Sequence, residues 1–110
     1  MSEERRKSPR YPVDLSATVE VAGQSQPGRV RDLCRDALFV EVPGSWPIGT
    51  QVRVAAVLPG GVGPVDMAGR VVRQADPGEE SPGVAVLFDD LSPSTATRID
   101  LFLAAQEEGG

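Results

Sequence analysis

The sequence predicts an all-β domain with one helix: a small six-stranded antiparallel barrel followed by a C-terminal α-helix. Short segments in which apolar and polar residues alternate recur along residues 13–89, with turn-forming residues between them. The 12 Gly and 10 Pro are scattered in small clusters, as expected for many tight turns. The last apolar segment, residues 92–105, has helical spacing instead. A length of 110 residues suits one compact domain.

The first strand is expected in DLSATVEV, residues 14–21, where apolar and polar side chains alternate as in a half-buried strand. Residues 59–64, PGGVGP, favour a hairpin connection between two later strands. Gly69 indicates a bulge or a bend. Trp46 and Ile48 are expected to fold back over one end of the core. The remaining strands are predicted at residues 29–33, 37–42, 50–58, 65–74 and 84–88.

The last predicted strand, VAVLF, is apolar on both faces, so it is expected to be central in the barrel wall or covered by the helix. In the segment that follows, Ser92 is a natural N-cap and Pro93 suits the first helical position. Helical spacing predicts one apolar face that ends at Gln106 and packs on an opening of the barrel. Its members are Ala96, Ile99, Phe102 and Leu103.

The composition excludes several kinds of functional site. The chain has no His and one Cys, so a His/Cys zinc site, a Ser-His-Asp triad and an internal disulfide cannot form within one chain. A net charge of −5 argues against general nucleic-acid binding. No nucleophile–base pair or Gly-rich phosphate loop is visible, so the chain is not expected to be an enzyme, nor to need a cofactor.

The N-terminal segment has a distinct character. Residues 1–11 are charged and offer no apolar anchor before Tyr11, so a flexible basic segment is expected there, with residues 12–106 as the folded domain and 107–110 as a disordered tail. A solvated basic tail and a local site for a small anion both fit this segment. It lacks the apolar stretch of a signal peptide, and no stretch is long enough to span a membrane, which favours the cytoplasm.

The segments RRKSPRYPVDL, RDLCRDALFVEV and GVAVLFDDLSPSTATRIDLFL carry a family resemblance that runs from about Arg5 to about Leu103. Together they resemble the PilZ domain family, bacterial receptor modules for cyclic di-GMP. RRKSPRYPVDL contains the family's Arg-x-x-x-Arg as Arg6 and Arg10. RDLCRDALFVEV is similar to the family's Asp/Asn-x-Ser-x-x-Gly followed by an apolar strand. GVAVLFDDLSPSTATRIDLFL is similar to its final strand and helix. The resemblance implies a regulatory barrel whose possible ligand is cyclic di-GMP.

The resemblance also implies which residues would hold the ligand. Arginine forks can bond guanine O6 and N7 and can meet phosphates, while an acidic side chain accepts from guanine N–H groups. Cys34 stands where the family has Ser, and Ala37 where it has Gly, a residue that lets the backbone approach closely and adopt positive φ. Asp36 replaces a frequent second Gly and adds a charge. The implied ligand residues are Arg5, Arg6, Arg10, Asp32, Cys34 and Ala37.

Two interpretations follow from this altered motif. The first is a stand-alone adaptor that regulates an unidentified motility, secretion or exopolysaccharide protein by direct contact, as a monomer or weak dimer, with weak or lost cyclic di-GMP binding. The alternative is a working receptor that uses Arg6, Arg10 and Asp32. The surroundings of the turn are open as well: Asp36 could pair with Arg35 or Arg31, Asp32 could only cap a turn, and Cys34 could be a small buried side chain.

Overall fold

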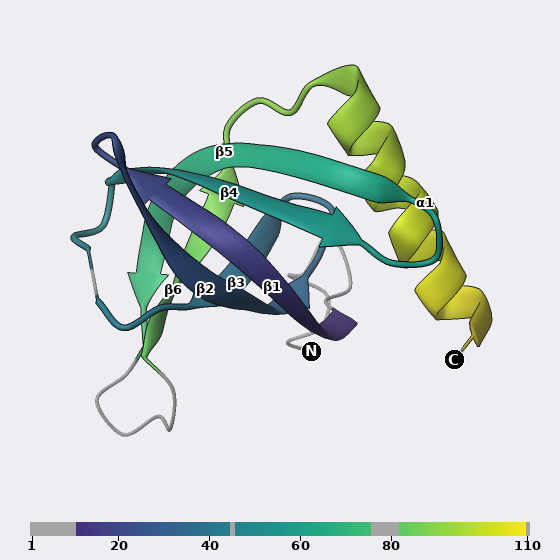
Figure 1. The fold of residues 1–110 in the computed structure, drawn as a ribbon, viewed down its shortest axis with the longest axis horizontal. Helices are drawn as coiled ribbons and strands as arrows, with labels where there is room; N and C mark the ends of the chain where they lie inside the picture. The colour runs from purple at the N-terminus through teal and green to yellow at the C-terminus, as the bar shows by residue number, and fades with distance from the viewer. Residues whose placement is uncertain (1–10, 45, 76–81, 110) are drawn as a thin grey trace, which may run out of the picture.

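The computed structural model describes residues 11–44, 46–75 and 82–109, and it confirms the predicted fold class (Figure 1). Six antiparallel strands form a closed barrel in the order β1-β2-β3-β6-β5-β4, and β4 pairs with β1 to complete it. One helix follows the last strand. The elements are β1 Tyr11–Val21, β2 Gln24–Leu33, β3 Ala37–Glu41, β4 Gln51–Leu58, β5 Gly63–Gln74, β6 Gly83–Phe88 and α1 Pro93–Gly109.

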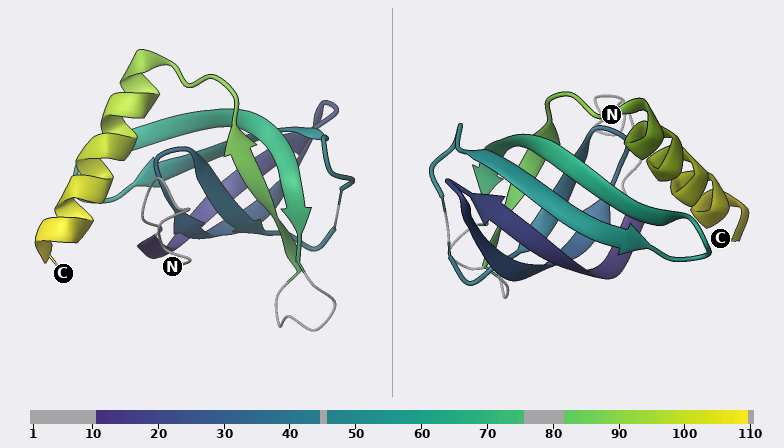
Figure 2. Two further views of the ribbon diagram at one scale, coloured as in Figure 1. Left: turned by 180° about the vertical axis from the view of Figure 1, so that it is seen from behind. Right: turned by 45° about the horizontal axis from the view of Figure 1, so that its top comes forward.

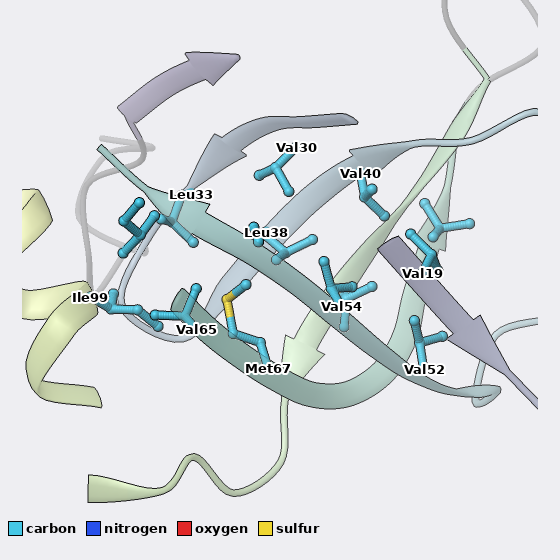
Figure 3. Packing of buried hydrophobic residues seen from close by; sticks show 14 of the residues in the cluster. Val19, Val30, Leu33, Leu38, Val40, Val52, Val54, Val65, Met67 and Ile99 are labelled. Atoms are coloured by element: carbon cyan, nitrogen blue, oxygen red, sulfur yellow. The ribbon is translucent and has the colours of Figure 1, made fainter. Parts of the chain in front are cut away.

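The barrel interior is filled by the apolar residues that the alternation places on one face of each strand. In β4 every second residue is buried, and the residues between them are exposed. Val19, Val54 and Val86 are fully buried and meet in a single core that Met67 and Leu38 extend (Figure 3). Because apolar side chains from all six strands fill the interior of this small barrel, we expect binding sites on its outer surface.

Gly69 is a point of close approach between strands. It pairs regularly with Val52 of β4 and with Phe88 of β6, and the nearest register shift lies further along, between Val71 and Arg73. A Cβ atom at position 69 would overlap the carbonyl oxygen of Leu87. Gly69 therefore allows β5 to curve close against β6, and the bulge lies elsewhere in the strand.

The helix α1 lies across one end of the barrel and packs on β5 and β4 (Figures 1 and 2). Ile99, Phe102 and Leu103 join the core, as the helical spacing predicted. Of the two explanations expected for the apolar character of β6, a central place in the barrel wall or a cover by the helix, the structure shows the first, because β6 lies between β3 and β5. The helix continues to Gly109, so residues 107–109 are helical where the sequence predicted a disordered tail at residues 107–110. Glutamates at 107 and 108 are good helix formers, which explains the extension. No helix among the described residues is long and apolar enough to cross a membrane.

The loop between β3 and β4 differs in part from its prediction. Trp46 is half-buried and packs against the core, as expected, but the side chain of Ile48 is 68% exposed. Gly49 N–H donates to the carbonyl of Val71 at 2.7 Å, and Thr50 closes a tight turn onto Pro47. This turn directs Ile48 away from the barrel, so only Trp46 covers the core.

We expect replacement of Ser92 by Ala to lower the free energy of unfolding by about 1 kcal/mol. Ser92 caps α1, because its Oγ accepts a hydrogen bond from the Thr95 amide at 3.2 Å. Urea denaturation measures the loss. Thr97→Ala is the matched control, since Thr97 is an exposed residue of the same helix and Ala favours helix. Equal stability of wild type and Ser92→Ala would show that the cap contributes nothing.

Candidate functional site

Strand pairing places the start of β1 beside the second predicted binding motif. Tyr11 lies opposite Leu33, and Pro12 lies opposite Asp32. Arg5, Arg6 and Arg10 lie outside the described residues. Because Arg10 is bonded to Tyr11, however, the basic segment joins the barrel directly beside the end of β2, where the second motif begins.

The second motif forms a turn that is tied to two other elements. Cys34 N–H donates to the carbonyl of Ala37 at 2.9 Å and closes the turn between β2 and β3. The carbonyl of Asp36 accepts a hydrogen bond of 2.9 Å from Phe88 N–H at the end of β6. Arg35 Nε lies 3.0 Å from Asp100 Oδ1 of α1. The turn is thus held between the last strand and the helix.

Cys34 is a buried, free thiol. Its Sγ donates to Asp36 Oδ1 at 3.2 Å. Burial raises the pKa of the Cys34 thiol, and the neighbouring carboxylate adds to this effect. The prediction of a small buried side chain is confirmed, and the neutral thiol has little capacity to act as a nucleophile.

The backbone of the turn corrects one expectation about Ala37. Of the described residues other than glycine, only Ala22 has a positive φ. Ala37 is an ordinary strand residue that pairs with Leu87 of β6. Position 37 therefore does not require glycine for its backbone angles in this structure, and Ala37 differs from glycine here only by its methyl group.

Asp36 is exposed. The sequence offered Arg35 or Arg31 as its ion-pair partner, but in the structure both arginines pair with other carboxylates. Arg35 pairs with Asp100, and Arg31 lies 3.6 Å from Asp14, which also binds Arg29. These carboxylates lie on other elements and draw both arginines away from the turn. Among the residues that the structure describes, the exposed Asp36 side chain contacts the Cys34 thiol and no cationic side chain.

The outer surface of β2, β3, β6 and β5 carries a row of side chains that begins at this motif. Asp32 lies opposite Phe39, Phe39 opposite Ala85, and Ala85 opposite Arg73. Phe39 faces outward because Leu38 and Val40 on either side are buried. Its ring lies over Gly83, since a Cβ atom there would come within 2.8 Å of Phe39 Cζ.

Arg73 extends this surface with a charge. Its guanidinium carbon lies 5.7 Å from the centroid of the Phe39 ring, within cation–π range. An aromatic ring, a guanidinium and the Asp32 carboxylate thus follow one another across the strands. Such a surface can stack a planar base and bond its edge. Phe39 and Arg73 were not among the predicted site residues; the one signal for them in the sequence is the aromatic residue on the outward face of ALFVEV.

A groove among the described residues lies on a different part of the barrel. It has a volume of about 890 Å³ and runs between β1, β4, the start of β5 and the first turns of α1. None of Asp32, Cys34 and Ala37 lines it. We assign the candidate site to the outer surface beside the turn, because the second motif lies there and β1 begins beside it. The groove is considered separately below.

Known proteins share this architecture. The PilZ domain family model matches residues 4–105. The inhibitor of motility MotI from Bacillus subtilis superposes with a TM-score of 0.80 at 15% identity, covering 96% of this chain and 53% of that protein. The chain thus spans about half the length of MotI. No curated protein matches the sequence.

Two isolated PilZ domains superpose over nearly their whole lengths. The domain of YcgR from Escherichia coli, solved with cyclic di-GMP, gives a TM-score of 0.72 at 14% identity, covering 96% of this chain and 94% of that domain. The PilZ domain of CeSA from a cellulose-synthesizing bacterium gives 0.65 at 21% identity, covering 90% and 99%. At these identities the superpositions show the fold, and the family assignment comes from the model match. This chain belongs to the PilZ domain family.

Proposed function

We propose that the chain is a regulatory domain of cyclic di-GMP signalling, which binds its ligand on the outer surface of β2, β3 and β6 and acts on a separate protein. The observation that carries this proposal is the pairing of Pro12 with Asp32. It joins the basic N-terminal segment to the barrel beside the altered second motif. The YcgR domain solved with cyclic di-GMP supports the choice of ligand.

The chemistry of the residues fits the two parts of this ligand. Arg6 and Arg10 would bond the guanine edge and the phosphates, with Arg5 as a further cation. Asp32 would accept hydrogen bonds from guanine N–H groups. Phe39, which is half-buried on the same outer row, and the Arg73 guanidinium over its ring would offer a stacking surface for a base.

We further propose that this binding is weak. The hydroxyl expected at position 34 is replaced by a buried thiol, a poorer hydrogen-bond partner, which already bonds Asp36. The exposed carboxylate of Asp36 would repel the ligand's phosphates. The domain would then regulate its partner largely through protein contact. Motility regulation is one candidate output, since MotI is described as an inhibitor of motility. A cytoplasmic location belongs to the same proposal.

Titration calorimetry with cyclic di-GMP tests the proposal. We expect weak binding by the wild type, and at least about a tenfold further loss for Arg10→Ala and for Asp32→Ala, because each removes a charge-assisted hydrogen bond. Arg29→Gln is the matched control: Arg29 is an exposed arginine of β2 that pairs with Asp14. Equal losses for Arg29→Gln and Arg10→Ala would indicate general charge attraction. If the wild type does not bind cyclic di-GMP at all, the remaining function is that of an adaptor that acts without this ligand.

A further inference from the structure

The groove on the other side of the barrel has a polar wall and a partly apolar floor. The apolar part of the floor is the outer surface of β4, where Ala55 and Val57 are exposed; the Val57 side chain is 66% exposed. The neighbouring strand β1 adds the exposed polar residues Ser16 and Thr18. The wall is the first two turns of α1, which contribute Ser94, Thr95 and Arg98. These elements differ from those that carry the turn of Cys34 and Asp36, so the groove is a separate surface.

Thr95 is the only buried polar residue of the described chain, with an exposed fraction of 4%. Its amide bonds the Ser92 cap, but its hydroxyl makes no hydrogen bond to any described residue. No fully enclosed side-chain oxygen or nitrogen among the described residues lacks a partner. The small exposed part of Thr95 must therefore include its hydroxyl, which opens into the groove that Thr95 lines. A buried hydroxyl directed into a groove without a protein partner is suited to bond a ligand.

Positive charge is concentrated at the same place. Arg98 is held by a hydrogen bond of 2.7 Å from Nη1 to the carbonyl of Pro64, and it forms no ion pair with any described acidic residue. The arginines at 29, 31, 35, 53 and 70, by contrast, all pair with carboxylates. The first turn of α1 carries no acidic residue to balance the positive end of the helix dipole. The groove is thus faced by a helix N-terminus and by a guanidinium that has no ion-pair partner among the described residues.

One carboxylate does line the groove. Asp66 lies in its wall, but Arg53 Nη1 binds Asp66 Oδ2 at 3.0 Å. That pair is balanced, so the unpaired charge in the groove is that of Arg98.

We propose that this groove binds a small organic anion, a carboxylate or a phosphate monoester, with a short apolar part. The oxyanion would accept hydrogen bonds from Thr95 Oγ1, the Ser94 amide and the Arg98 guanidinium. The apolar part would lie over Ala55 and Val57. This site does not rest on cyclic di-GMP binding, since it uses a different wall of the barrel.

The test is an NMR titration of the ¹⁵N-labelled chain with two probes, inorganic phosphate and butanoate, each against chloride at the same ionic strength. We expect saturable shifts of the Ser94 and Thr95 amides with at least one probe, and none with chloride. The probe that binds more tightly shows whether the site prefers a phosphate or a carboxylate. If butanoate binds, its shifts should extend to Ala55 and Val57. Shifts that match those in chloride, or that never saturate, would overturn the proposal.

Two substitutions make the test specific. Thr95→Val keeps the shape of the side chain and removes the hydroxyl, and Arg98→Gln removes the charge at a partly exposed site. Each should raise the Kd of the probe at least about tenfold, as expected for loss of a hydrogen bond to a charged group. Arg29→Gln, on β2, is the charge-matched control and should bind as the wild type does. Unchanged affinity in Arg98→Gln, with an unchanged melting temperature, would contradict the assignment even if Thr95→Val fails to fold.

Discussion

Replacement of Gly69 by Ala is expected to destabilise the barrel by about 3 kcal/mol, the upper end of the usual range for overpacking. The added Cβ would overlap the carbonyl oxygen of Leu87 and come within 2.9 Å of Val86 Cγ1. Neither neighbour can move easily, since the first is backbone in a closed barrel and the second is a fully buried core residue. Thermal denaturation should show a fall in Tm of at least about 10 °C.

Gly44→Ala provides the matched control for this prediction. A Cβ atom at position 44 would meet no atom within 4 Å, and its φ is not in the left-handed region. The same chemical change should therefore shift stability by no more than about 0.5 kcal/mol, as surface substitutions usually do. If both variants melt at the same temperature, the close contact between β5 and β6 does not exclude a residue larger than glycine at position 69.

The sequence predicted the strands and the helix well because both have local periods. The alternation of residues 14–21 and the helical spacing of Ile99 and Phe102 each involve only neighbouring residues, and both reappear in the pattern of burial. The orientation of Ile48 was wrong for the opposite reason. Its turn is fixed by the hydrogen bond from Gly49 to Val71, a residue far along the chain whose position no local pattern gives.

The candidate site was predictable only in part. Asp32 and Cys34 could be selected because the motif that contains them is contiguous in sequence. Phe39 and Arg73 could not, because they meet only through the strand order that places β6 between β3 and β5. The local surroundings of Asp36 likewise depended on Asp14 and Asp100, which draw Arg31 and Arg35 to β1 and α1. Short motifs indicate where a ligand surface begins, and strand pairing decides what completes it.

The turn residues, rather than the arginines, are expected to limit cyclic di-GMP affinity. A serine at 34 would restore a hydroxyl in place of the thiol that now bonds Asp36. A glycine at 36 would remove an exposed carboxylate, and a glycine at 37 would remove a methyl group beside Leu87. The last change acts through space alone, because the backbone at 37 already has ordinary strand angles.

The combined variant Cys34→Ser, Asp36→Gly, Ala37→Gly should bind cyclic di-GMP about a hundredfold more tightly than the wild type. Each change is expected to recover about 1 kcal/mol, and 1.4 kcal/mol is a factor of ten in affinity. The measurement is the Kd of both proteins by calorimetry at one salt concentration, since phosphate contacts weaken with salt. Adding Arg10→Ala to the combined variant should remove the gain.

Glu20→Gln controls for the lost negative charge, because Glu20 is an exposed acid near the β1–β2 hairpin, at the other end of β2 from the turn. It should leave the Kd within about twofold of the wild type, since charges beyond a Debye length of about 10 Å are largely screened. A gain in Glu20→Gln equal to that of the combined variant would assign the effect to net charge. Tight binding by the unaltered protein would show that Cys34, Asp36 and Ala37 are compatible with a working site, so that the domain is a full receptor.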